Sequence, residues 1–183
     1  MWRNFCGWLL RTLGWTVGEG TAPEKICIIL GVPHTSIMDF VISYLYYTSV
    51  GGKFKCMVKK EAFVWPVGPI LRAMGAVPVD RSNSTSLMVS LIHEMEKADT
   101  FHLVLAPEGT RKPVRKWKTG FHTIARQVGC PVYLGYFDWK NKKVGRGQKV
   151  ELTENAREDM NRIQGIYEQM NLTGKHPEMY VTH

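Results

Sequence analysis

The sequence lacks the patterns that mark several large classes of protein. Its four cysteines are scattered and form no Cys-x-x-Cys motif, which is typical of reduced thiols in a cytosolic environment and disfavours a zinc site. The six histidines include no His-Glu-x-x-His, so a metalloprotease is unsupported. No glycine-rich loop of Walker or dinucleotide type follows the first expected strand. The sequence therefore predicts no bound metal and no nucleotide cofactor.

Acidic residues are also scarce. The chain has 16 of them against 24 lysines and arginines, which gives a formal net charge of +8 over 183 residues. Such a balance favours acidic partners, namely nucleic acid, an anionic membrane or a phosphorylated substrate. No nucleic-acid-binding motif is present, so we expect no nucleic-acid partner. The hydrophobic fraction of 44% and the absence of repeats or linkers are typical of a single folded domain.

The N-terminus contains no apolar run long enough to cross a bilayer. Residues 2–17 hold three tryptophans, two arginines and no acid, and four large apolar side chains recur at helical spacing. This stripe consists of Trp2, Phe5, Leu9 and Leu13. A signal peptide fits poorly, because the apolar core is broken and no cleavage site follows. We expect residues 1–20 to form an amphipathic, membrane-associating helix, the alternative being a terminal helix docked on the protein's own core.

From Lys25 onwards, strand-like and helix-like segments alternate along the chain. The expected strands cover residues 26–30, 53–59, 75–81, 101–106 and 131–137, with a weak edge strand within 144–152. The expected helices cover residues 37–47, 61–74 (bent or split by prolines), 82–97, 119–128 and 154–170. The last of these helices looks polar and exposed, and the final dozen residues look loosely ordered. This alternation predicts one α/β domain over residues 21–183, with a mostly parallel sheet flanked by helices.

The corner after the first strand carries a histidine and an aspartate. Gly31 and Pro33 interrupt the chain there, so His34 falls between strand and helix, where open α/β sheets bind ligands. Five helical positions turn a side chain by about 140°, so His34 and Asp39 meet only if His34 lies in the loop and Asp39 in the first helical turn. His34 would then be a general base that Asp39 orients. Alternatively, Ser36 and Asp39 form a capping box.

A second polar segment follows the strand expected at 101–106. Arg111 supplies a rigid guanidinium suited to bidentate phosphate binding, and Gly109 lets the backbone approach a ligand closely. Glu108 is placed to order Arg111 or to contact a substrate, and Thr110 lies between them. The alternative is a tight turn followed by a solvated basic face.

Arg81 ends the strand expected at 75–81. Taken alone, it is equally consistent with a surface salt bridge to Asp80. However, each of the three polar segments ends a strand, and parallel strands end at one sheet edge. The sequence therefore predicts an edge that gathers a base, its orienting acid and two phosphate-sized cations.

These segments resemble the glycerolipid acyltransferase family that includes the 1-acyl-glycerol-3-phosphate acyltransferases. That family carries a His-x-x-x-x-Asp block, matched by His34 and Asp39, and a block ending in arginine, similar to residues 75–81. Its Glu-Gly-Thr-Arg block is present as residues 108–111, and its proline-containing apolar strand is resembled by residues 131–134. The resemblance covers roughly residues 26–137.

The resemblance implies a reaction and a set of residue roles. His34, oriented by Asp39, would deprotonate an acceptor hydroxyl, which then attacks an acyl thioester without a metal or an acyl-enzyme intermediate. The implied phosphate ligands are Arg81 and Arg111, with Glu108, Gly109 and Thr110 completing the substrate-binding pocket. Ser36 acting as a nucleophile beside His34 is a rival mechanism.

The resemblance also implies partners and a location. The donor would be acyl-CoA or acyl carrier protein, with no further cofactor, and the acceptor a lysophospholipid in a membrane. We expect a peripheral or monotopic protein on the cytoplasmic face. Pro33 and Gly135 depart from the family pattern, which leaves the acceptor open between lysophosphatidic acid, another lysophospholipid and an acylated amino acid. A catalytically inactive, membrane-binding relative is the other alternative.

Overall fold

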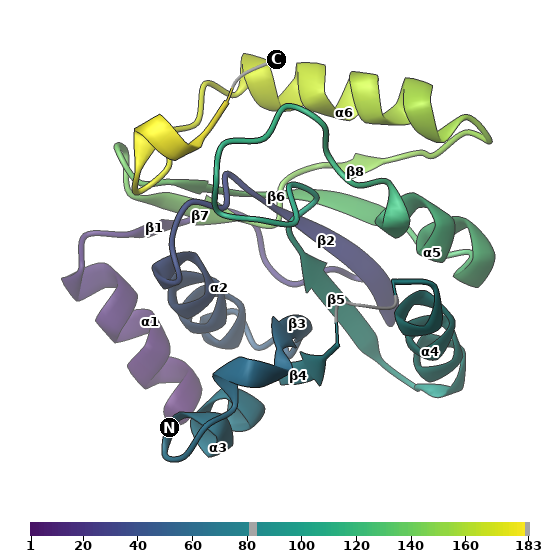
Figure 1. The fold of residues 1–183 in the computed structure, drawn as a ribbon. Helices are drawn as coiled ribbons and strands as arrows, with labels where there is room; N and C mark the ends of the chain where they lie inside the picture. The colour runs from purple at the N-terminus through teal and green to yellow at the C-terminus, as the bar shows by residue number, and fades with distance from the viewer. Residues whose placement is uncertain (81–83, 182–183) are drawn as a thin grey trace.

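The central strands are apolar runs that are buried on both faces. In β2 (Ile26–Val32) every residue after the first is buried, and β6 (Val132–Asp138) is buried except at Tyr136. Because such strands expose no polar face to water, helices must cover both sides of the sheet. The computed structural model describes residues 1–80 and 84–181, and it places helices on both faces (Figure 1).

The sheet is mostly parallel, as the alternation of strands and helices predicted. Its strands are β1 (Thr16–Val17), β2 (Ile26–Val32), β3 (Lys55–Lys59), β4 (Ala76–Val79), β5 (Phe101–Leu105), β6 (Val132–Asp138), β7 (Lys143–Gly145) and β8 (Lys149–Val150). Among the described residues the order is β1-β7-β6-β2-β5-β3-β4, with β8 also paired to β6. The five strands from β6 to β4 run parallel, whereas β7 and β8 are antiparallel to β6.

Two groups of helices enclose two hydrophobic clusters, one on each face of the sheet. The α-helices are α1 (Trp2–Thr12), α2 (Met38–Ser49), α3 (Val67–Ala73), α4 (Ser84–Lys97), α5 (Gly120–Val128) and α6 (Ala156–Gln169), and the 3₁₀ turns are η1 (Lys60–Ala62) and η2 (Pro177–Met179). Helices α1, α2 and α3 pack on one cluster, and α4, α5 and α6 on the other (Figure 1).

The register of the sheet brings two of the polar segments together. Strands β2 and β5 are parallel, with Ile26 opposite Phe101 and Leu30 opposite Leu105. The loops that follow them therefore leave the sheet at the same edge. His34 lies in the first of these loops and Glu108 in the second. Arg81, expected at the same edge, lies outside the described residues.

The N-terminal and edge segments differ in detail from the prediction. The first helix ends at Thr12, and Thr16–Val17 then pairs with β7 as the outermost strand of the sheet. The expected edge strand is split into β7 and β8, with Gly147 between them. Gly147 has a φ of 70°, and a Cβ there would overlap the carbonyl oxygen of Leu134. The segment 61–74 is split into η1 and α3, as predicted, with Pro66 directly before α3 and Pro69 inside its first turn.

Helix α6 lies within the range predicted for it, residues 154–170, but the sequence predicted an exposed helix and the structure buries one of its faces. Helix α6 buries Met160, Ile163 and Tyr167 in the core, because these three residues form a helical stripe that the surrounding charges obscure. The residues after it are tied to the rest of the fold as well. The backbone N–H of Trp139 donates to the Thr173 carbonyl at 2.8 Å, and the backbone N–H of His176 donates to Thr35 Oγ1 at 3.3 Å. The C-terminal segment is thus bound to the loop that carries His34.

Candidate active site

The structure brings His34 and Asp39 into contact. His34 lies in the loop after β2 and Asp39 in the first turn of α2, and His34 Nδ1 is 3.4 Å from Asp39 Oδ2. The histidine side chain is 30% exposed, whereas that of Asp39 is only 1% exposed. The ring therefore stands between solvent and a buried carboxylate, and among the residues that the structure describes its Nε2 has no hydrogen-bond partner. This is the arrangement of a base and its orienting acid.

The Asp39 carboxylate accepts hydrogen bonds from three N–H groups. Oδ2 accepts from the backbone of Thr35 at 2.9 Å and of Ser36 at 2.8 Å, and Oδ1 accepts from Trp139 Nε1 at 2.8 Å. Ser36 Oγ in turn accepts from the Met38 N–H at 3.2 Å, as in a capping box. The capping role and the pairing with His34 thus hold together, because one carboxylate orders the loop and faces the ring.

Trp139 is a residue of the site that the sequence did not indicate. It directly follows β6, and its ring packs edge-on against Trp15 at a centroid distance of 4.9 Å. The ammonium groups of Lys142 and Lys175 each lie 5.1 Å from its centroid, within cation–π range. Asp39 is therefore held from both sides, by the loop before α2 and by a residue at the end of β6 that is 100 residues away in sequence. No local pattern marks this contact.

Glu108 supports the backbone of the histidine. Its Oε2 accepts the His34 N–H at 2.7 Å, and the residue is buried. Burial, helped by the negative charge of Asp39, raises the pKa of Glu108 to about 8, while the hydrogen bond from His34 acts in the opposite direction. The sequence predicted that Glu108 would order Arg111 or contact a substrate. The structure adds a contact to His34 that joins the two segments directly.

The raised pKa of Glu108 predicts a specific pH dependence of stability. Between pH 4.5, which is the ordinary pKa of the group, and about pH 8, the folded chain retains a proton that the unfolded chain releases. The free energy of unfolding therefore falls as pH rises through this range. The slope from this group is at most about 1.4 kcal/mol per pH unit. Glu108→Gln keeps an acceptor for the His34 N–H but does not titrate. We therefore expect its stability relative to the wild type to increase with pH across this range.

Chemical denaturation of both proteins at several pH values between about 5 and 8 measures this difference. A difference that stays constant with pH would show that Glu108 does not titrate in this window. Subtracting the two curves removes the contributions of the other titrating groups, because they are common to both proteins.

The loop after Glu108 is shaped by glycine and presents cations. Gly109 has a φ of 67°, and a Cβ there would come within 2.8 Å of the Lys118 side chain. The loop is closed by the Lys118 N–H, which donates to the Pro107 carbonyl at 2.8 Å. Thr110 Oγ1 accepts the Lys112 N–H at 3.1 Å, and the Arg111 side chain is exposed. Arg111 is thus presented to solvent in the loop that follows β5.

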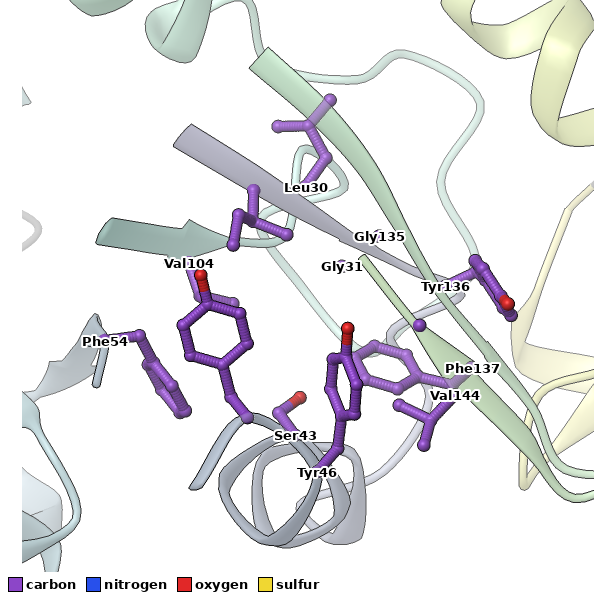
Figure 2. A pocket seen from close by; sticks show the side chains of 13 residues that line it. Leu30, Gly31, Ser43, Tyr46, Phe54, Val104, Gly135, Tyr136, Phe137 and Val144 are labelled. Carbon is purple, nitrogen blue, oxygen red and sulfur yellow. The ribbon is translucent and has the colours of Figure 1, made fainter. Parts of the chain in front are cut away.

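An apolar cavity lies behind the site, between α2 and the sheet. Figure 2 shows Tyr46 of α2 facing Phe137 of β6, with Ser43 beside them. Ser43 Oγ donates to the Asp39 carbonyl at 2.8 Å, one helical turn after the carboxylate. The cavity therefore borders the helix that carries Asp39, but its lining includes none of the expected site residues.

A second His–Asp pair is structural. His122 Nε2 of α5 lies 3.0 Å from Asp159 Oδ2 of α6, and both side chains are buried. Burial acts to raise the pKa of Asp159, but hydrogen bonds from Arg162, Thr153 and His122 outweigh it and lower the pKa. Because both side chains are buried, no substrate can reach this pair, and its role is to join the two helices. Among the described residues, only the His34–Asp39 pair combines a partly exposed ring with a buried acid.

A profile of the acyltransferase family matches residues 16–133, which is more than half of the chain and includes both polar loops. The chain therefore belongs to the acyltransferase family, as the sequence blocks predicted. It is similar in structure to the 1-acyl-sn-glycerophosphate (LPA) acyltransferase PlsC from Thermotoga maritima. The TM-score is 0.63 at 18% sequence identity, and the match covers 95% of this chain and 80% of that chain. This likeness confirms the α/β fold. The search against curated proteins found no match.

Proposed function

We propose that this protein transfers a fatty acyl group from a thioester, acyl-CoA or acyl carrier protein, to the hydroxyl of a lysophospholipid. The acceptor that we favour is 1-acyl-glycerol-3-phosphate, and the product is then phosphatidic acid. The observation that carries the proposal is the pairing of a partly exposed His34 with a buried Asp39 at 3.4 Å. Family membership supports acyl transfer, and the fold shared with a protein that acts on lysophosphatidic acid supports the acceptor.

The proposed reaction needs one proton relay and no covalent enzyme intermediate. His34 accepts the proton of the acceptor hydroxyl at Nε2, and Asp39 stabilises the imidazolium from the Nδ1 side. The hydroxyl oxygen attacks the thioester carbonyl carbon, the C–S bond breaks, and the departing sulfur takes the proton from His34. Glu108 holds the histidine backbone during these steps. The thioester and the alcohol supply every bond made or broken, so no cofactor is required.

Arg111 is the proposed ligand of the acceptor's phosphate, with Gly109 and Thr110 forming the same loop and Arg81 as a second cation. Its exposed guanidinium can approach a phosphate with two parallel N–H donors. We expect Arg111→Ala to raise the KM for a phosphorylated acceptor by about tenfold to a hundredfold, with a smaller change in kcat. Steady-state kinetics with the acceptor varied at saturating donor measures the effect.

Arg115→Ala is the matched control for Arg111→Ala. Arg115 is another exposed arginine of the same loop, so its removal changes the net charge equally. An equal rise of KM in both variants would show that Arg111 acts only through general electrostatic attraction. An unchanged KM in Arg111→Ala would show that Arg111 does not bind the phosphate.

The membrane part of the proposal rests on α1. The helix buries Cys6 and Leu10 against α2 but leaves Trp2, Phe5 and Trp8 exposed. The exposed stripe differs from the predicted one, because Trp8 is exposed and Leu9 half-buried. Within the described ranges, no helix has the length and apolarity to cross a bilayer. We propose that α1 binds the membrane peripherally through this aromatic ridge, on the cytoplasmic face, which accords with the free cysteines.

The test of the proposed function is release of free thiol from acyl-CoA or acyl carrier protein by the purified protein. The acceptors are lysophosphatidic acid, other lysophospholipids and acylated amino acids. Release that requires lysophosphatidic acid supports the full proposal, and release with another acceptor keeps the reaction but changes the substrate. Silence with every acceptor, from a folded and vesicle-bound protein, would establish an inactive relative instead.

A further inference from the structure

The segment between β3 and β4 exposes a cluster of large apolar side chains. The cluster, called the α3 apolar cluster below, consists of Val64, Trp65, Val67 and Ile70. Trp65 is 86% exposed, although tryptophan is usually largely buried, and Val64 is 61% exposed. Contiguous exposed apolar surface of this kind marks a site of interaction with a protein or a membrane.

The α3 apolar cluster belongs to the same helical layer as α1. Phe63 and Leu71, which flank it, are half-buried in the hydrophobic cluster that also contains Cys6 and Leu10 of α1. Figure 1 shows α1, α2 and α3 covering one face of the sheet. Two elements of this layer, far apart in sequence, therefore each bury one side in the core and expose aromatic side chains on the other.

The topology also relates the cluster to the catalytic edge. Strand β3 runs parallel to β5, and β5 runs parallel to β2. Residues 60–66 therefore leave the sheet at the edge from which the loops carrying His34 and Glu108 leave. A surface that binds this cluster lies beside the same edge of the sheet.

The charges around the cluster select the partner. Residues 53–75 contain five cations and one acid, Glu61. The cations are Lys53, Lys55, Lys59, Lys60 and Arg72. All five are exposed, and Lys60 pairs with Asp80. Helix α1 adds Arg3 and Arg11 and no acid. Exposed tryptophan and aliphatic side chains in a segment with this excess of cations match the interface of a bilayer with anionic headgroups.

We propose that the α3 apolar cluster is a second membrane-contact surface, which inserts into the headgroup region of an anionic bilayer together with α1. One amphipathic helix leaves the domain free to rotate about its axis, whereas two separate contacts fix the orientation. The catalytic edge is then held at the lipid surface that contains the acceptor. The inference deepens the proposed function, but binding to a bilayer does not depend on turnover.

The test is co-sedimentation with vesicles of phosphatidylglycerol and phosphatidylcholine, in the absence of any substrate. We expect Trp65→Ser to weaken partitioning into anionic vesicles at least about tenfold, because it removes the largest apolar side chain of the cluster. Val64→Ser and Ile70→Ser should each weaken it less. The matched control is Val89→Ser on α4, where the valine is 63% exposed on the opposite face of the sheet. We expect its partitioning to be unchanged.

Three results would overturn the proposal. The first is unchanged vesicle partitioning of the Trp65→Ser/Ile70→Ser double variant, and the second is a loss of partitioning in Val89→Ser equal to that in Trp65→Ser. The third is a cluster variant that still binds vesicles but no longer binds acyl carrier protein. The last would assign the surface to an acidic protein. The exposure of Trp65 and Ile70 keeps these variants folded, which circular dichroism checks. If the wild type shows no turnover but Trp65→Ser still loses vesicle binding, the proposed function fails and the membrane surface stands.

Discussion

Replacing His34 with alanine is expected to lower kcat by about a thousandfold, within the range that a general base contributes. The substitution removes a ring that is 30% exposed, so little core packing is lost. The His34 backbone N–H, which Glu108 accepts, remains in place. We therefore expect the free energy of unfolding and vesicle binding to stay close to those of the wild type. Thiol release and chemical denaturation of the same preparation measure both quantities.

Two further variants sharpen the interpretation of His34→Ala. His93→Ala removes an exposed imidazole from α4, on the opposite side of the sheet from α2, and should leave kcat unchanged. Ser36→Ala distinguishes direct transfer from a serine acyl-enzyme. Its backbone N–H still donates to Asp39, so direct transfer predicts activity within a few-fold of the wild type. Loss of activity in Ser36→Ala equal to that in His34→Ala would favour the acyl-enzyme, and full activity in His34→Ala would refute the base.

Asp39→Asn is expected to lower kcat by about a hundredfold or more and to destabilise the fold by about 1–3 kcal/mol. The carboxylate accepts N–H groups on both oxygens, from Thr35 and Ser36 on one and Trp139 on the other. An asparagine has one acceptor oxygen, so in either orientation its NH₂ group faces another donor. The neutral amide also leaves the imidazolium of His34 without its counter-charge.

A double variant separates these two effects. Trp139→Phe removes the donor opposite Oδ1 and keeps an aromatic ring beside Trp15. In the Asp39→Asn background we expect Trp139→Phe to recover stability, because the opposing donors are gone, but not kcat, because the charge is still missing. Kinetics and denaturation of the four proteins of this cycle provide the test. A kcat of Asp39→Asn within a few-fold of the wild type would leave Asp39 as a helix cap only.

The sequence by itself determined the features that depend on nearby residues. The alternation of apolar strands with helices and the spacing of His34 and Asp39 are local patterns, and both predicted the geometry that the structure shows. The predicted splitting of residues 61–74 has the same origin, because prolines act on their own backbone. The four sequence blocks likewise indicated the acyltransferase family that the profile match establishes.

Only the tertiary structure decided how the site is supported. The bonds from Trp139 to Asp39 and from Glu108 to His34 join segments 100 and 74 residues apart, and they exist because β6 and β5 both flank β2 in a fixed register. The burial of α6 has a similar cause, since its apolar stripe is short and depends on the sheet face that receives it. Residue spacing reports which side chains share a face of one element, whereas contacts between elements follow from the strand order of the sheet, which local patterns do not encode.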